Sequence, residues 1–200
     1  AIDAFSGGAP GLVDRVVAGE AKVDEFEVNI DNDCGQIIVR RQPAASDLRL
    51  IMAISKTVTD LERIGDEAEK IARISGQIHE RGRMPLEQFA GVRHAAAVAV
   101  AMLRQGLDAF ARLDAVEAAK VIREDRAIDS EFRSILRQLI TFMMEDPRTI
   151  STALEVLWVA KAVERIGDHA KNIAEHVIYI VRGTDVRHTA LEQIEREALG

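Results

Sequence analysis

The chain has 200 residues, of which 48% are hydrophobic and 30% charged, so it is long enough to bury a sizeable core in one or two globular domains. Its formal net charge of −7, without a basic stripe, disfavours nucleic acid as a partner. The single cysteine, Cys34, excludes an internal disulfide, and we interpret it as a small buried residue in a reducing compartment. No stretch approaches the roughly 20 apolar residues of a membrane helix, and no signal peptide opens the chain, so the sequence predicts a cytoplasmic protein.

The chain has a composition that favours helix throughout, since aromatics are only 4% and helix-forming residues are plentiful. Residues 1–6 have the pattern of a helix end, stopped by two glycines and Pro10. Apolar residues at helical spacing, with capping signals between the segments, indicate the remaining helices. The predicted helices cover residues 12–41, 46–77, 86–113, 115–145 and 147–182. Gly183 is the expected C-cap of the last of these, and residues 184–200 form a polar tail with weak reason to pack.

The chain contains an internal duplication. The pentapeptide ERIGD occurs at residues 62–66 and again at residues 164–168, and DAF occurs at residues 3–5 and 108–110. We therefore predict an all-α fold of two tandem three-helix bundles related by duplication. The expected division is a first repeat over residues 1–82, a second repeat over residues 83–183, and the tail.

The two repeats differ at their starts. The helix over 86–113 extends well before Asp108, whereas the first repeat has no counterpart to this extension, so its first helix is expected to be mostly missing. Apolar residues such as Val23, Phe26 and Ile64 would then be exposed. We expect this surface to be covered by another chain or by displaced elements of the same chain, and the protein to form a homo-oligomer.

Each repeat contains two copies of a short motif, in which an acidic residue is followed, after three intervening residues, by an aspartate. The two acids of a copy lie one helical turn apart and repel each other by a few tenths of a kcal/mol when ionised. Four carboxylates converging in a groove of one bundle would suit hard cations such as Mg²⁺, Mn²⁺, Ca²⁺ or iron, with zinc less favoured. We expect the second repeat to bind a metal ion, because its bundle is complete. The candidate metal ligands are Glu20, Asp24, Glu62, Asp66, Asp125, Asp129, Glu164 and Asp168.

The roles of other residues near these acids are inferred from their places on the helices. Asn172 continues the stripe of the second pentapeptide and could add a ligand, which Lys70, at the equivalent position, could not. His169 and His176 point away from the stripe, and we predict that both are solvated. The two glycines of the pentapeptides, each costing about 1 kcal/mol against alanine within a helix, are expected to permit close helix–helix approach.

Two alternative functions stay open on this evidence, a carboxylate-bridged metalloenzyme and a metal-free helical adaptor whose acids form a solvated face. The sequence has no Ser-His-Asp or Cys-His arrangement, phosphate-binding loop or dinucleotide fingerprint. The Glu-x-x-His ligand pair of di-iron bundles is also missing from the paired positions. We therefore predict that the protein is not an enzyme and has no catalytic residues.

The sequence resembles the PhoU family of phosphate-uptake regulators. The likeness lies in residues 42–49, 60–66, 143–148 and 164–177. It implies two three-helix bundles whose acidic motifs, in some members, bind multinuclear metal clusters at the eight positions named above. It further implies a cytoplasmic negative regulator of phosphate uptake and phosphate-starvation signalling. The implied partners are the ATPase subunit of a phosphate ABC transporter and a phosphate sensor histidine kinase, and the implied cofactors are divalent or ferric metal ions.

Overall fold

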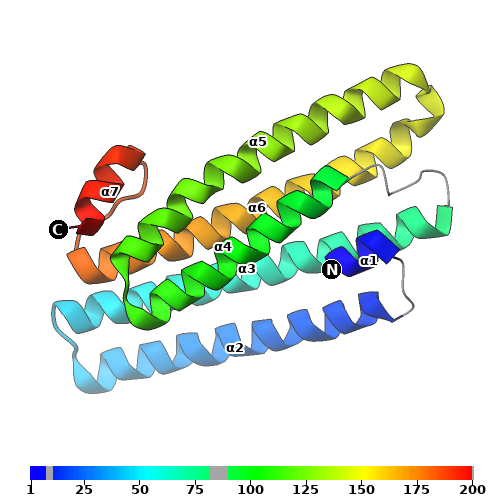
Figure 1. Ribbon diagram of the computed structural model, residues 1–200. Coiled ribbons are helices and arrows are strands. Elements are labelled where there is room, and N and C mark those ends of the chain that lie inside the picture. Colours follow the sequence, from blue (N-terminus) through cyan, green and yellow to red (C-terminus); the bar gives the residue numbers. More distant parts are fainter. Residues whose placement is uncertain (8–10, 82–89, 200) are drawn as a thin grey trace.

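The structure is a computed structural model of the chain and describes residues 1–7, 11–81 and 90–199 (Figure 1). Within these ranges the chain is helical and contains no strand, which confirms the predicted all-α class. The helices are α1 (Ile2–Gly7), α2 (Leu12–Arg41), α3 (Ser46–Arg81), α4 (Ala90–Arg112), α5 (Ala115–Glu145), α6 (Ile150–Arg182) and α7 (Leu191–Leu199), with a short 3₁₀ turn, η2 (Pro147–Thr149), before α6.

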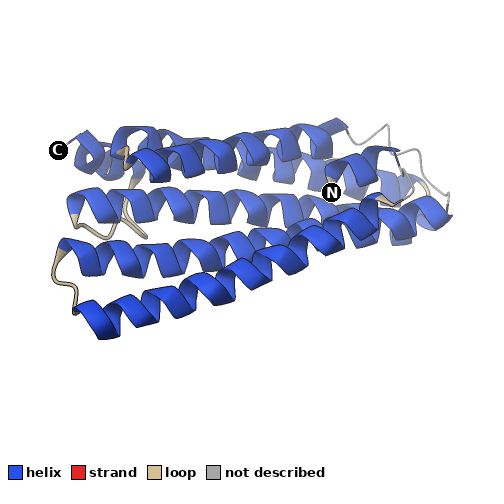
Figure 2. Ribbon diagram, turned by 90° about the horizontal axis from the view of Figure 1, so that it is seen from below, coloured by secondary structure: helices blue, strands red, loops and turns tan. Residues whose placement is uncertain are grey.

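The five long helices α2 to α6 run side by side in an elongated bundle (Figures 1 and 2). Helix α6 contacts α3, α4 and α5, whereas α2 packs mainly on α3 and meets α1 only at one end. The contact between α3 and α6 joins the two repeats, since each of these helices carries one copy of the pentapeptide. The repeats therefore meet through the helices that bear the duplicated motif.

Local capping explains where several predicted helices begin and end. Helix α2 ends at Gln42, which adopts a left-handed conformation with φ of 47° directly before a proline. Helix α5 begins after Asp114, whose carboxylate accepts hydrogen bonds from the backbone N–H groups of Val116 and Glu117, each at 3.0 Å. The bounds predicted for these two helices are confirmed.

Two local features set the start of α6. The Asp146 carboxylate accepts a hydrogen bond of 3.0 Å from the backbone N–H of Arg148, and Pro147 opens the 3₁₀ turn that leads into the helix. Gly183 then closes α6 with φ of 75°, as predicted. Helix α3 continues to Arg81, beyond its predicted end, while the starts predicted around Pro85 and the stop at Pro10 lie outside the described residues.

The hydrophobic core is concentrated in the second repeat. Helix α5 buries Val121, Ile128 and Leu139 almost completely against α4 and α6. In the first repeat, α2 buries only Cys34 among its apolar residues, as predicted for this thiol. Helix α1 covers one end of this repeat, where Phe5 is fully buried.

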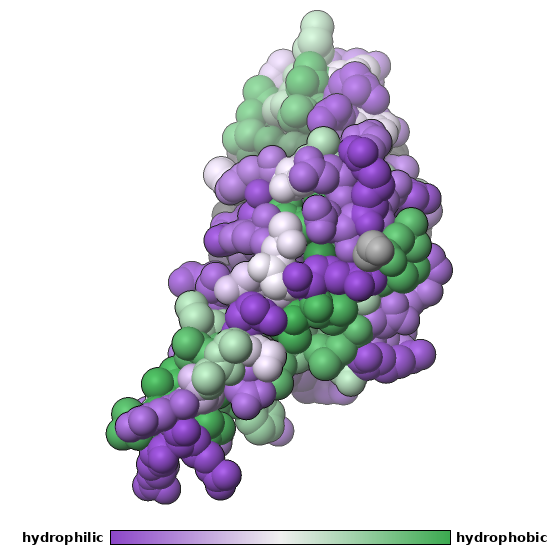
Figure 3. All heavy atoms as spheres, turned by 90° about the vertical axis from the view of Figure 1, so that its left-hand side faces the viewer, coloured by the Kyte–Doolittle hydropathy of each residue, from purple (hydrophilic) through white to green (hydrophobic). Residues whose placement is uncertain are grey.

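The surface that the sequence predicts to be exposed is only partly so. Phe26 on α2 is 63% exposed, as expected, whereas Val23 is half-buried. Ile64 is buried, because α3 lies between α2 and α6, so elements of the same chain cover this side chain. Ile38 and Val39, near the end of α2, are also exposed. Figure 3 shows hydrophobic surface among hydrophilic side chains at the lower, protruding part of the molecule, where the α2–α3 end lies.

The prediction that residues 184–200 pack weakly is wrong. Helix α7 folds back against α5 and buries Ile194 and Ala198, which lie one turn apart, and Val186 precedes it as a further buried residue. An ion pair between Arg123 of α5 and Glu195 of α7 adds a contact at the edge. Two apolar side chains on one face of α7, together with Val186 before the helix, therefore dock a mostly polar segment. No helix in the described ranges is both long enough and apolar enough to cross a membrane.

Candidate functional site

The four candidate acids of the first repeat face one another across α2 and α3. A Cβ atom built on Gly65 would lie 3.7 Å from Cγ of Glu20, so the two helices approach closely beside the acids. Loss of water raises the pKa of Glu20, and interactions with Asp24 and Asp66 raise it further. The pKa of Glu62 is raised by the same loss of water and by the charge of Asp66. The structure thus brings Glu20, Asp24, Glu62 and Asp66 into one negative field.

Little positive charge compensates this first group of acids. The Glu62 Oε2 atom is buried and has no hydrogen-bond partner among the described residues. The nearest cation is Arg63, whose guanidinium nitrogens lie 3.3 Å from that oxygen and 3.7 Å from an Asp66 carboxylate oxygen. This arginine is half exposed, so solvent screens much of its attraction.

The acids of the second repeat lie on α5 and α6 and are paired with lysines. Lys171 Nζ lies 2.9 Å from an Asp125 carboxylate oxygen, and Lys161 Nζ lies 2.6 Å from Glu164 Oε1. Loss of water and the charges of Glu164 and Asp125 raise the pKa of Asp168, against the opposing effect of the two lysines.

Asp129, the remaining candidate of the second repeat, has a weaker partner. Its carboxylate lies 4.0 Å from the guanidinium of Arg133 on the next turn of α5, where both side chains are largely exposed. This pair is at the limit of an ion pair and contributes little. The second group of acids is therefore neutralised chiefly through Asp125 and Glu164.

The two groups of acids differ because their neighbours differ. When the two pentapeptides are aligned, Thr59 stands at the position of Lys161 and Glu69 at that of Lys171. The Thr59 hydroxyl donates a hydrogen bond of 2.9 Å to Glu27, and so adds no positive charge to the candidate acids. The first repeat therefore has one more acid and two fewer cations at equivalent positions.

The donor atoms of both groups suit hard cations, but the side chains do not surround an ion as they stand. Among the described residues, no set of three His, Cys, Asp or Glu side chains is placed to hold one metal ion together. Carboxylate oxygens are the ligands that Mg²⁺, Mn²⁺ and Ca²⁺ prefer. Binding in the second repeat would require Lys161 and Lys171 to release their carboxylates, whereas in the first repeat only Arg63 has to move.

A second cluster of polar side chains lies where the two repeats meet. A ring nitrogen of His169 on α6 lies 2.8 Å from one carboxylate oxygen of Asp60 on α3. A ring nitrogen of His176, also on α6, lies 3.0 Å from the other oxygen. Asn172 donates a third hydrogen bond, of 3.0 Å, to the same carboxylate. Burial alone would raise the pKa of Asp60, but these hydrogen bonds lower it to about 2.

The prediction that His169 and His176 are solvated is wrong. Both face the other repeat, and His176 is buried. Asn172 also turns its amide toward Asp60, so its donor group is engaged there. The partner of all three residues lies in the other repeat, and for that reason spacing within one helix could not reveal it.

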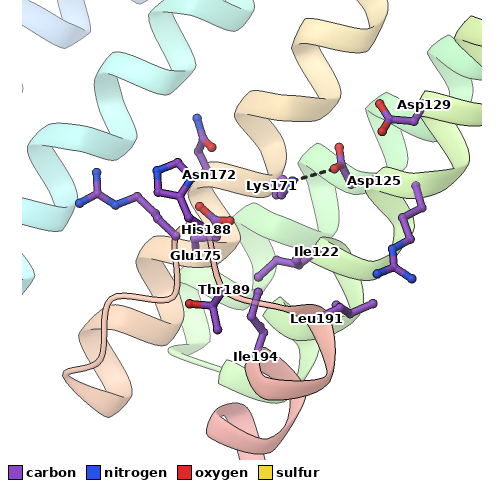
Figure 4. A pocket seen from close by; sticks show the side chains of 12 residues that line it. Ile122, Asp125, Asp129, Lys171, Asn172, Glu175, His188, Thr189, Leu191 and Ile194 are labelled. Atoms are coloured by element: carbon purple, nitrogen blue, oxygen red, sulfur yellow. Dashed lines mark hydrogen bonds and ion pairs between the residues drawn. The ribbon is translucent and has the colours of Figure 1, made fainter.

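A pocket of about 430 Å³ lies between α5, α6 and the segment that leads into α7 (Figure 4). Its wall combines charged side chains with an apolar part formed by Ile122, Leu191 and Ile194. Asp125 and Asp129 belong to it, so it adjoins the second group of acids. The sequence did not indicate this pocket, because it depends on the return of α7 against α5.

The family-model comparison matches both halves of the chain. The PhoU domain model covers residues 1–75 and residues 92–177. The phosphate-specific transport system accessory protein PhoU homolog of Pseudomonas aeruginosa is 50% identical over 197 residues, covering 98% of this chain and 81% of the relative. The corresponding PhoU protein of Escherichia coli K12 is 46% identical over 193 residues, covering 94% of this chain and 78% of the relative.

Solved structures show the same fold. The crystal structure of PhoU from Pseudomonas aeruginosa aligns with a TM-score of 0.87 at 49% identity, covering 92% of this chain and 87% of that one. The phosphate transport system regulatory protein PhoU from Streptococcus pneumoniae aligns with a TM-score of 0.78 at 24% identity, covering 87% and 81%, a likeness of fold alone. With both repeats matched by the family model and close to half of the residues identical to those of named relatives, the chain belongs to the PhoU family.

Proposed function

We propose that this protein is a cytoplasmic negative regulator of phosphate uptake and phosphate-starvation signalling. The single observation that carries the proposal is the 50% identity, over 98% of the chain, to a phosphate-specific transport system accessory protein. The proposed partners are the ATPase subunit of the phosphate ABC transporter and the phosphate sensor histidine kinase. An all-helical bundle with large exposed side chains on α2 suits a role in protein contacts better than one in chemistry.

A complementation experiment tests this function. The protein is expressed in a bacterial strain that lacks its own PhoU and carries a reporter for phosphate-starvation genes. We expect it to restore repression in phosphate-rich medium and to co-purify with the transporter ATPase. A reporter that stays fully active, together with no recovery of the ATPase or the kinase, would refute the proposal.

We also propose that the acidic groups bind hard divalent or ferric cations. The support is the donor set and, in the first repeat, the buried Glu62 oxygen without a hydrogen-bond partner. The sequence favours the second repeat, but the charge balance favours the first, because the second has lysines on two of its acids. A bound cation would supply the positive charge that the four carboxylates of the first repeat lack.

A matched pair of variants tests the cation sites. Asp66 and Asp168 hold equivalent positions, so Asp66→Asn and Asp168→Asn each remove one charge from one group. A free metal concentration of about 100 times the dissociation constant stabilises the folded state by about 2.7 kcal/mol. We expect Mn²⁺ to raise the melting temperature of chelator-stripped protein, Asp66→Asn to reduce this rise, and Asp168→Asn to reduce it less. Asp33→Asn, exposed on α2, is the control.

The melting experiment also decides between the proposal and a metal-free adaptor. The ion pairs of Lys161 and Lys171 favour that second candidate, since they already neutralise acids without a metal. If Mn²⁺, Mg²⁺ and Fe³⁺ all leave the melting temperature unchanged, the acids form a solvated face and the cation proposal fails. The regulatory proposal would survive that result, because the complementation experiment tests it separately.

A further inference from the structure

The pocket between α5, α6 and α7 contains a buried carboxylate that has no direct hydrogen-bond or ion-pair partner among the described residues. Glu175 is only 7% exposed, and neither a hydrogen bond nor an ion pair engages it within the described parts of the chain. It lines the pocket, and Figure 4 shows its carboxylate directed toward that space. A buried charge without a partner is costly, so an unpaired carboxylate at a pocket wall points to a group that binds there.

The other charges of the pocket are largely paired. Lys171 binds Asp125, and Arg187 forms a two-pronged ion pair with Asp185 at distances of 2.6 Å to 3.1 Å. Arg126 also lines the pocket, and among the described residues it has no hydrogen bond or ion pair. Glu175 and Arg126 therefore have no direct partner among the described residues, while Asp129, which also lines the pocket, has only its weak pair with Arg133.

The remaining wall is apolar. Ile122 of α5 and Leu191 and Ile194 of α7 supply it, and the volume of about 430 Å³ falls within the range typical of small-molecule pockets. Burial raises the pKa of Glu175, against the opposing charges of Lys171 and His176, which agrees with a carboxylate that lacks a direct partner. Inorganic phosphate does not fit this combination, because Glu175 would repel an anion.

We propose that this pocket binds a small dipolar metabolite whose amino group pairs with Glu175 and whose anionic group pairs with Arg126. A hydrocarbon or ring between these two groups would lie on the apolar wall. Such a ligand would contact α5, α6 and α7 at once, and would fix the docking of α7 on the second repeat. The pocket adjoins the second group of acids through Asp125 and Asp129, but the proposed contacts with Glu175 and Arg126 require neither a bound cation nor the proposed regulatory role.

Binding is tested with a series of ω-amino carboxylates of increasing chain length, beginning with γ-aminobutyrate. The controls are the fatty acids that lack the amine, the alkylamines that lack the carboxylate, and inorganic phosphate. Saturation-transfer NMR and calorimetry are carried out on the whole chain in the presence of a chelator, so that metal binding has no influence. We expect at least one dipolar compound to bind about tenfold more tightly than both of its singly charged analogues.

Variants then locate the site. Glu175→Gln keeps the side-chain size, Arg126→Gln shortens the side chain but leaves it polar, and each removes one charge, so each should weaken binding of the dipolar compound about tenfold. Glu145→Gln and Arg137→Gln, which lie on α5 outside the pocket, should leave binding unchanged. Because Glu175→Gln removes an unpaired buried charge, the variant should melt no lower than the parent. The proposal is overturned if no compound of the series binds, if a singly charged analogue or phosphate binds equally well, or if Glu175→Gln binds like the parent.

Discussion

The two repeats share a sequence pattern but are packed to different degrees. In α5, Val121 and Ile128 are almost completely buried, whereas the aligned residues of α2, Val16 and Val23, are only half-buried. Helix α5 is covered by both α4 and α6, while α2 rests mainly on α3 with the short α1 at one end. The same apolar stripe therefore buries more surface, and stabilises the fold more, where more helices surround it.

The repeats also differ in their electrostatics. The well-packed second repeat pairs its acids with lysines, while the first repeat leaves its acids in mutual repulsion. The contact between α3 and α6 couples the two, since Asp60 of the first repeat is held by three side chains of the second. Stability of the first repeat is accordingly expected to depend on this contact.

The largest effect is expected from Asp60→Ala, which breaks the coupling itself. Buried His176 and its neighbours would lose their acceptor, and we expect the free energy of unfolding to fall by about 3 kcal/mol. Urea unfolding measures this fall, with Asp33→Ala on exposed α2 as the control. A loss no larger than that of the control would show that the repeats are not coupled through Asp60.

The same carboxylate gives a pH dependence of known sign. The folded pKa of Asp60, about 2, lies below its ordinary value of 3.8, so its ionised form stabilises the folded state. This contribution is present above about pH 4 and is lost as the pH falls through about 2. Acid unfolding of the parent should show this component, and Asp60→Ala should lack it.

Truncation of aligned valines compares the packing directly. Val121→Ala removes methyl groups from a closed core and should lower the free energy of unfolding by roughly 2 kcal/mol. Val16→Ala, at the aligned and half-exposed position, should cost less than about half as much. Equal losses in denaturant unfolding would contradict the view that α2 is loosely packed.

The two pentapeptide glycines should respond to alanine with opposite signs. At Gly65 an added Cβ would meet only ordinary contacts of 3.7 Å and 3.8 Å, so Gly65→Ala should stabilise by up to about 1 kcal/mol. At Gly167 the Cβ would lie 2.5 Å from Cδ1 of buried Ile128, which must move, so Gly167→Ala should destabilise by about 1 kcal/mol. Thermal melts of both variants measure the difference, which should vanish if the helices are equally spaced.

The smallest effect is expected from Glu62→Gln in metal-free protein. The folded pKa of Glu62 is raised, so its ionisation opposes folding, and its unfavourable effect grows as the pH rises through the ordinary value of 4.5 to the higher folded value. Removing the charge should stabilise the protein at neutral pH by a few tenths of a kcal/mol. Melting curves at pH 4 and pH 7 would contradict this if the variant lost stability at neutral pH.

Local sequence signals were sufficient for the helices and for part of the candidate site. Cap residues such as Asp114 and Gly183 act within a few residues of the chain, so the helix ends they set were predictable. The duplicated pentapeptides indicated that α3 and α6 are equivalent. Glu20 was recognised as paired with Asp24, and Glu62 with Asp66, because spacing within one helix is fixed by the helical repeat.

The sequence by itself determined the all-α class, the order of the helices and the pairing of acids along each helix, because these follow from propensity and periodicity. Tertiary structure decided that His169 and His176 bind Asp60, that an added Cβ would clash at Gly167 but make only ordinary contacts at Gly65, and that the polar tail docks to form a pocket. Each of these outcomes depends on which surfaces of separate helices meet. A periodic pattern specifies the face that a helix presents, but the partner of that face is chosen only when the whole chain packs.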